Sequence, residues 1–137
     1  MTNIKKMHEK QIVNLLKQSV EQRYEYFIRY CSDFEQVWGL VVEEDNWVIF
    51  KDNDGNEIFP LWPHHDLAEK CCFHEHKEMG AIPQAINLDS FINNCIPDMN
   101  NEGVVFGIFY DEFREGMIVD GNLLKEDILN ETESTWE

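Results

Sequence analysis

The sequence predicts an α+β fold, with an antiparallel sheet of about five strands and helices packed mainly on one face. Segments with helical periodicity lie at both ends and in the middle of the chain, and the strand-like segments come in two runs. The expected order of elements is α-α-β-β-β-α-α-β-β-α. Segregated runs of this kind are typical of antiparallel sheets, whereas α/β folds alternate strands and helices. We expect a three-stranded meander and a C-terminal hairpin.

The composition is that of one globular domain. With 137 residues, of which 43% are hydrophobic, the chain can bury a core without disulfides or metals. We expect a single domain over 1–137, with its core over about 5–129 and a frayed acidic tail over 130–137. No apolar run approaches the ~18 residues of a membrane span, and no apolar signal-peptide segment follows the N-terminal lysines. These features predict a soluble cytoplasmic protein.

The first segment is expected to form two helices. Its apolar residues recur at the spacing of one helical face, at Ile12, Leu15, Leu16, Val20, Tyr24, Phe27, Ile28 and Cys31. Ser19 and Gln22 interrupt this stripe at the spacing of a capping box, in which each side chain accepts a hydrogen bond from the other residue's backbone N–H. A second helix is therefore expected from Ser19, after a kink or a break, to Ser32-Asp33.

Three strands are expected next, over residues 37–42, 47–50 and 58–59. They are rich in β-branched and aromatic residues, and polar turns separate them. The turn Asp52-Asn53-Asp54-Gly55 favours a tight hairpin, because these residue types tolerate left-handed backbone conformations. The three strands make up the predicted meander.

Prolines mark the end of the meander. Pro60 cannot donate to a β ladder, so it indicates a sheet edge or the exit of the third strand. Asp66 and Glu69 then resemble a capping box at the start of a helix. Glycine and proline at residues 80–83 end that helix.

A second central helix is expected after the short extended piece Ala85-Ile86. Asn87 is its expected cap, and its apolar face consists of Leu88, Phe91, Ile92 and Cys95. Pro97 is expected to terminate this helix, so that residues 98–103 form a polar loop.

A hairpin and a last helix complete the chain. Residues 104–110 are apolar on both alternating faces, as expected for a central strand. Residues 111–116 form a charged turn, and 117–119 form the partner strand. Asp120 or Asn122 would cap a final helix that carries Leu123, Leu124 and Ile128.

Charge is the most pronounced compositional feature, with 27 acidic and 11 basic residues and a net charge of −16. A field of this sign repels nucleic acid and anionic lipid and attracts a basic protein surface. The main functional prediction is a non-enzymatic interaction module, in one form an immunity or antitoxin-like protein that masks a basic partner. The candidate contact residues lie in acidic loops, at Glu43, Glu44, Asp45, Asp111 and Glu112. The alternative is that acidity only maintains solubility and that these runs are solvated turns.

A second functional prediction is a small-ligand binder or an enzyme. Its candidate pocket residues are Trp62, His64, His65, Asp66 and Arg23. Asp66 would orient a histidine as a general base, and Arg23 would anchor an anion. The structural alternative is that Trp62 fills the core, His64 caps a helix, and Arg23 is a surface residue or the partner in a buried pair. No GxSxG or phosphate-loop motif is present, so the sequence favours a non-enzyme.

The cysteines and histidines of the middle helix do not predict a metal site. Cys71 with His74, and Cys72 with His76, would share helix faces, but each pair needs outside ligands to complete tetrahedral zinc. We expect no metal and no cofactor, and we interpret the four cysteines as buried thiols. The sequence leaves homodimerisation through a strand edge or the helix pair open.

Several short stretches resemble one known family. They are Arg23-Tyr24-Glu25-Tyr26-Phe27, Trp38-Gly39-Leu40, Pro60-Leu61-Trp62-Pro63-His64, Ile86-Asn87-Leu88 with Phe91, and Ile96-Pro97. Together they are similar to the DUF2750 family of small, mainly bacterial proteins, over the stretch from Glu21 to Pro97. The resemblance implies a bacterial cytosolic protein with a single compact domain. It implies no activity, cofactor or catalytic residue, because the family carries none that is established.

Overall fold

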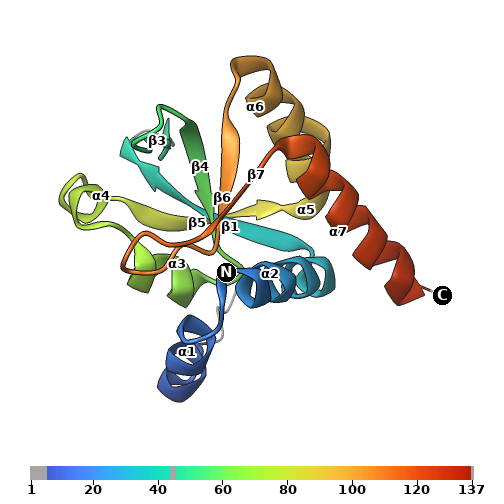
Figure 1. The fold of residues 1–137 in the computed structure, drawn as a ribbon, viewed down its shortest axis with the longest axis horizontal. Coiled ribbons are helices and arrows are strands. Elements are labelled where there is room, and N and C mark those ends of the chain that lie inside the picture. The colour runs from blue at the N-terminus through green and yellow to red at the C-terminus, as the bar shows by residue number, and fades with distance from the viewer. Residues whose placement is uncertain (1–5, 44–45, 137) are drawn as a thin grey trace.

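The computed structural model describes residues 6–43 and 46–136, with side chains up to residue 133. The described strands form two sheets that fan out from a common centre (Figure 1). One sheet has the order β2-β1-β5 and the other the order β3-β4-β6-β7. The strands are β1 (Gln36–Val42), β2 (Asn46–Trp47), β3 (Phe50–Lys51), β4 (Glu57–Leu61), β5 (Ile82–Asn87), β6 (Val105–Ile108) and β7 (Met117–Val119). The predicted α+β class is confirmed.

The helices are distributed over both sheets rather than on one face of a single sheet. They are α1 (Glu9–Leu16), α2 (Val20–Phe34), α3 (His65–Cys71), α4 (His74–Glu78), α5 (Leu88–Ser90), the π-helix η2 (Phe91–Cys95), α6 (Ile96–Glu102) and α7 (Gly121–Trp136). α3 packs against β1 and β5, whereas α2 packs against β1, β7 and α7 (Figure 1). Within residues 6–43 and 46–136, no helix is both long and apolar enough to cross a membrane.

The helix boundaries follow local signals at the two ends of the chain. The two predicted helices are confirmed, the junction between them is a break rather than a kink, and Ser19 and Gln22 form the predicted capping box. The Asp120 carboxylate accepts a hydrogen bond from the Leu123 N–H (2.9 Å), so Asp120 is the residue that caps α7. The helix then continues through residues 130–136, the segment expected to be an acidic tail.

The prediction of one five-stranded antiparallel sheet is wrong, because the strand expected over residues 47–50 divides between the two sheets. Trp47 pairs with Val41 on β1, whereas Phe50 pairs with Ile58 on β4. A strand that turns a corner in this way contributes to two sheets. In addition, β5, which was expected only as a short extended piece, pairs antiparallel along most of β1.

The C-terminal hairpin is joined directly to the N-terminal strands. β6 pairs antiparallel with β7, as predicted, but it also pairs in parallel with β4 over Ile58–Leu61. A parallel pair needs a long crossover, which the connection over residues 62–104, with its helices and β5, supplies. The two sheets meet at Trp38 and Trp62, where each backbone N–H donates to the carbonyl of the other residue (3.0 and 2.8 Å).

Pro60 lies at the exit of β4, one of its two expected positions, but β4 is a central strand and not a sheet edge. The Leu61 carbonyl accepts a hydrogen bond from the Phe109 N–H (2.8 Å), so the backbone groups of Leu61 point toward β6. Because these groups alternate along a strand, the backbone groups of Pro60 point to the opposite side of β4, toward β3. There β3 reaches only to Ile58, so position 60 needs no N–H donor.

The prediction that Pro97 terminates a helix is also wrong. Helical structure runs from Leu88 to Glu102, and Pro97 lies in the first turn of α6. The π-helix η2 comes directly before it, and its wider turn resets the hydrogen-bond register so that the missing N–H of proline falls where a new helix begins. Gly103, in a left-handed conformation (φ 75°), ends α6 instead.

The core lies where the two sheets meet the helices. Its fully buried aromatic residues are Phe27, Phe59, Trp62, Phe91, Phe106 and Phe109. They come from α2, from β4 and β6 and the residues directly after these strands, and from the π-helix, so this core forms only when distant segments of the chain come together.

The hydroxyl of Tyr24 holds α2 to α7 by donating to Asp127 Oδ2 (2.5 Å). Burial, followed by this hydrogen bond, raises the pKa of Tyr24 well above its usual value, so the donor stays protonated. We expect Tyr24→Phe to lower the free energy of unfolding by about 1–3 kcal/mol, because the acceptor is charged. Urea denaturation of Tyr24→Phe, Asp127→Asn and the double variant measures this. Additive effects of the two substitutions would contradict the proposed contact.

Candidate functional site

Four of the five predicted pocket residues lie at the corner between β4 and α3, namely Trp62, His64, His65 and Asp66. β4 ends at Leu61, Trp62 bridges to β1, and α3 begins at His65. Trp62 is 1% exposed, and its indole N–H donates to the Tyr110 carbonyl (2.9 Å). Because this side chain is buried and its polar atom is bonded, Trp62 fills the core rather than lining an open pocket.

His64 is the N-cap of α3. Its Nδ1 accepts a hydrogen bond from the Asp66 N–H (3.0 Å), and the residue is 7% exposed. The predicted capping box of Asp66 and Glu69 is therefore wrong, because the helix begins two residues earlier than an Asp66 cap requires. The imidazole replaces the usual Ser, Thr, Asp or Asn side chain as the acceptor.

The carboxylate of Asp66 is shared between two partners. Oδ1 lies 3.0 Å from His65 Nδ1, and Oδ2 accepts a hydrogen bond from the Met7 N–H (2.7 Å). Burial alone would raise the pKa of Asp66, but the hydrogen bonds from His65 and Met7 and the nearby imidazoles lower it overall. Asp66 thus orients His65 as the sequence suggests, while also tying the N-terminal segment to α3. The His65 ring packs edge-on against Trp38, with ring centroids 5.3 Å apart.

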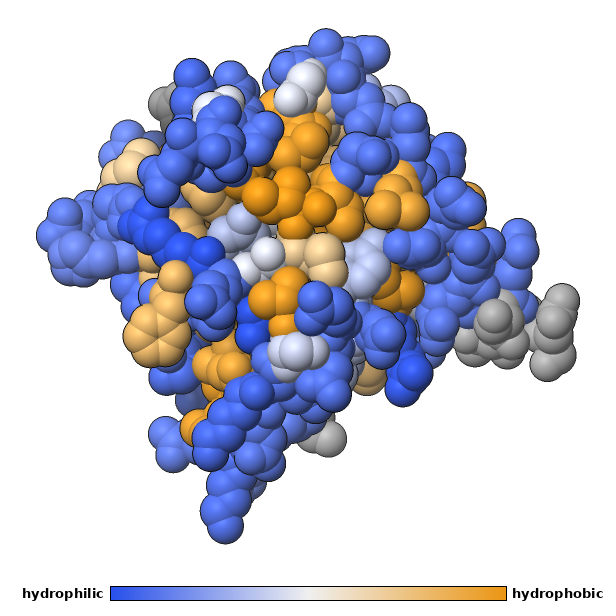
Figure 2. All heavy atoms as spheres, viewed as in Figure 1, coloured by the Kyte–Doolittle hydropathy of each residue, from blue (hydrophilic) through white to orange (hydrophobic). Residues whose placement is uncertain are grey.

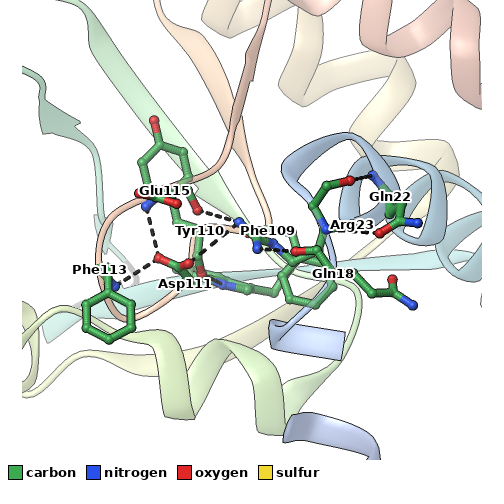
Figure 3. Close-up of polar contacts among 10 residues, drawn as sticks. Gln18, Gln22, Arg23, Phe109, Tyr110, Asp111, Phe113 and Glu115 are labelled. Carbon is green, nitrogen blue, oxygen red and sulfur yellow. Dashed lines mark hydrogen bonds and ion pairs between the residues drawn. The ribbon is translucent and has the colours of Figure 1, made fainter. Parts of the chain in front are cut away.

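Arg23 lies in the interior, at 3% exposure, where it connects α2 to the β6–β7 hairpin (Figure 3). Its Nε, Nη1 and Nη2 donate to the carbonyls of Phe109 (3.2 Å), Gln18 (3.0 Å) and Glu115 (2.8 Å). Nη2 also lies 3.8 Å from Asp111 Oδ2. This arrangement corresponds to the buried-pair alternative, since each guanidinium nitrogen already has a backbone acceptor.

The acidic loops expected on the surface have different roles. Asp111 is 8% exposed, and its Oδ1 accepts hydrogen bonds from the N–H groups of Phe113 (2.9 Å) and Glu115 (3.0 Å). Glu112 is exposed and pairs with Lys70 (3.7 Å). Glu43 is exposed as well. Glu44 and Asp45 lie outside the residues that the structure describes, and an interaction role for these loops stays a prediction.

The thiols are unsuited to nucleophilic or metal chemistry in their present surroundings. Burial raises the pKa of Cys71 to about 12, that of Cys95 to about 11, and that of Cys31 well above its usual value. The single helix expected between Asp66 and Gly80 is interrupted after Cys71, because Phe73 is buried against Phe50 and α4 starts only at His74. Cys71 and His74 therefore do not share one helix face. The residues of 6–43 and 46–136 contain no group of three or more His, Cys, Asp or Glu that could hold a metal.

Two hollows beside the α2–α7 pair, which we call the acidic hollows, are lined by several carboxylates. The first has a volume of about 230 Å³ and is lined by Ser32, Asp33, Glu35, Asn87, Leu88, Asp89, Ile92, Leu129 and Thr132. The second, of about 590 Å³, is lined by Tyr24, Glu25, Ile28, Arg29, Asp127, Asn130 and Glu131. The only basic residue in these linings is Arg29, which lies 3.9 Å from Glu131.

The acidic hollows were missed by sequence reasoning because they depend on the pairing of α2 with α7. Glu25 and Asp127 are about a hundred residues apart in the chain, and no local pattern predicts that their helices meet. A weak signal was available, since Asp127 and Glu131 are spaced i, i+4 and therefore share one helix face.

The buried contacts of Arg23 predict a specific loss of stability. We expect Arg23→Lys to lower the free energy of unfolding by about 2–4 kcal/mol, because an ammonium cannot reach the carbonyls of Phe109 and Glu115 together and leaves a buried acceptor unsatisfied. Arg29→Lys is the matched control; its side chain is 75% exposed, and the expected loss is below about 0.5 kcal/mol. Chemical denaturation of both variants measures the difference, and equal losses would contradict the bracing role.

His76 predicts a pH dependence. Burial lowers the pKa of this imidazole below its ordinary 6.5, while Glu75 raises it and Arg114 lowers it to smaller extents. The unfolded chain then takes up a proton at higher pH than the folded chain. The free energy of unfolding is therefore expected to fall as the pH drops below about 6.5. Urea denaturation at several pH values between about 5 and 8 gives the free energy of unfolding as a function of pH. This free energy should change less with pH in His76→Phe, a variant that keeps the stacking on Phe73.

The control for this pH dependence is His74→Phe, since the His74 side chain is 83% exposed. In this variant, the free energy of unfolding should change with pH as it does in the wild-type protein. Equal slopes in His76→Phe and the wild-type protein would show that another group is responsible.

The comparison with known proteins covers most of the fold. Residues 24–128 match the family described as "Protein of unknown function (DUF2750)". The matched segment begins in α2 and ends in α7, so it includes both sheets and extends past the stretch from Glu21 to Pro97 that carries the resemblance in the sequence. No curated protein matches the chain. The chain belongs to the DUF2750 family.

Proposed function

We propose that this protein is a non-enzymatic interaction module whose acidic hollows bind a basic protein partner. The observation that carries the proposal is the first hollow, which is bordered by the exposed carboxylates of Asp33, Glu35 and Asp89 above apolar side chains. None of these three carboxylates forms an ion pair with a residue in the described ranges 6–43 and 46–133. A lysine or arginine side chain suits such a surface, because its aliphatic stem packs on apolar groups while its charged head meets carboxylates.

The charge of the whole chain supports the same class of partner. A net charge of −16 accelerates encounter with a basic protein, and binding relieves the mutual repulsion of the carboxylates. In its more specific form, the proposal is that this module acts as an immunity or antitoxin-like protein by masking the basic surface of its partner. The interaction should weaken with salt, because exposed charges are screened within about 10 Å at 0.1 M.

The alternative, a small-ligand site or enzyme at the histidine corner, has one observation in its favour. His65 and Asp66 are hydrogen-bonded (3.0 Å), as in an oriented general base. Trp62 and His64 are buried and their polar atoms are engaged by Tyr110 and Asp66, which leaves less room for a substrate beside that pair. We therefore favour the interaction module.

Removing the three carboxylates of the first hollow tests the proposal. Asp33→Asn, Glu35→Gln and Asp89→Asn in one variant should weaken binding of the basic partner, captured from the native host, by about tenfold or more at low salt. Three ion pairs of about 0.5–1 kcal/mol each give this magnitude. Isothermal titration calorimetry with the purified partner at two salt concentrations measures it.

A matched control removes the same charge elsewhere. Glu69→Gln, Glu78→Gln and Glu102→Gln change three exposed carboxylates outside the acidic hollows, and binding should change less than about threefold. Equal weakening by both triple variants would mean that total charge, and not this surface, determines binding. Failure to capture any protein of positive net charge would contradict the proposed function.

A further inference from the structure

The loop between β6 and β7, residues 111–116, presents an aromatic side chain to solvent. Phe113 is 85% exposed, the largest fraction among the exposed large hydrophobic side chains in the described part of the chain. Its ring projects away from the loop's polar contacts (Figure 3). A single exposed apolar residue is common on protein surfaces, so its meaning depends on what holds it there.

Buried polar groups hold this loop in one conformation. The Asp111 carboxylate accepts hydrogen bonds from the N–H groups of Phe113 and Glu115, and the Arg23 guanidinium donates to the Glu115 carbonyl (2.8 Å). The Trp62 indole fixes the start of the loop through the Tyr110 carbonyl (2.9 Å). Two of the four buried polar or charged residues described, Arg23 and Asp111, therefore support one surface loop.

Both neighbours of Phe113 are tied to the α3–α4 segment. Arg114, in a left-handed conformation (φ 64°), forms an ion pair with Glu75, and its guanidinium carbon lies 4.1 Å from the centre of the Phe73 ring. Glu112 pairs with Lys70 (3.7 Å). At the far end of the loop, Gly116 leaves the space that the Tyr110 ring occupies, because a Cβ there would overlap the ring. Phe113 is thus held at a fixed position before any partner binds.

An apolar patch lies on the strands that this loop joins. β7 follows it directly, and its Ile118 is 43% exposed. Figure 2 shows a hydrophobic band over β6 and β7 on the face viewed in Figure 1, with hydrophilic residues on both sides of it. An exposed aromatic residue held in place by its loop, with polar residues around it, is typical of a binding hot spot and its rim.

We propose that Phe113 is the apolar anchor of this module and inserts into an apolar pocket of the basic protein partner, beside cationic residues of that pocket's rim. The charge of the whole chain, −16, identifies the partner as basic; beside Phe113, Glu115 adds an exposed carboxylate, whereas Glu112 is paired with Lys70 and Arg114 with Glu75. A surface of this sign disfavours nucleic acid and anionic membranes. Because the loop is braced in advance, little conformational entropy is lost on docking. This inference rests on the proposed function, since it names a second contact of the same partner.

Site-specific crosslinking in the full-length protein tests the anchor. A benzophenone amino acid replaces Phe113 in the native host, and in a control it replaces Met79, which is 59% exposed at the end of α4. We expect position 113, but not position 79, to crosslink to a protein of positive net charge. That protein, once purified, should bind Phe113→Ala about 10- to 100-fold more weakly than wild type, and Phe113→Leu with an intermediate affinity. Met79→Ala should bind as wild type.

The outcomes separate the two proposals. If the triple variant at Asp33, Glu35 and Asp89 loses binding while Phe113→Ala stays within twofold of wild type, the anchor is overturned and the proposed function stands. If neither variant affects binding, or if the crosslinked protein is acidic, both are overturned. If Phe113→Ala instead abolishes binding to phosphatidylcholine vesicles, the loop contacts lipid and the protein anchor is overturned. Unchanged thermal unfolding of Phe113→Ala establishes that the variant is folded.

Discussion

The guanidinium of Arg23 connects parts of the chain that are almost ninety residues apart. It joins the N-terminal turn of α2 to the carbonyls of Phe109 and Glu115, on either side of the β6–β7 turn. A buried arginine is costly to desolvate, and only a full set of acceptors makes it tolerable. Here three carbonyls and the Asp111 carboxylate supply that set. The hairpin, through β6, is also the parallel partner of β4, so the same contact fixes α2 relative to the second sheet.

The corner from β4 to α3 depends on the same hairpin. Trp62 reaches the Tyr110 carbonyl, next to the Phe109 carbonyl that Arg23 binds. It also closes the backbone bridge to Trp38 that joins the two sheets. The histidines after it are then placed by geometry, His64 as the cap of α3 and His65 against Trp38. The contacts of Trp62, His64 and His65 are therefore explained by the architecture of this corner.

Local features were predictable from the sequence because their causes are local. Ser19 and Gln22 cap each other across one helical turn, and Asp52 closes its turn by accepting from the N–H of Asn56 (2.9 Å). The β4–β6 pairing was not predictable, since nothing in either segment indicates its partner. Pro97 misled for a related reason: the π-helix that accommodates it has no recognised sequence signal. In the candidate site, the pairing of His65 with Asp66 follows from adjacency, whereas the acidic hollows follow only from the packing of α2 on α7.

The distribution of charge between interior and surface is consistent with the recognition role that we propose. An active site usually keeps its ionisable groups in a cleft, with environments that tune them toward proton transfer. In this protein, two of the buried ionisable groups, Arg23 and Asp111, are occupied with backbone groups of one hairpin, and burial raises the pKa of the Cys71 thiol. What these buried groups position is a surface: a braced loop that exposes Phe113 and Glu112 to solvent. Such a fold uses buried polar residues to fix the shape of its exterior, which suits it to the proposed binding of another macromolecule. Contacts that are already in position lose less conformational entropy on binding, and this raises affinity.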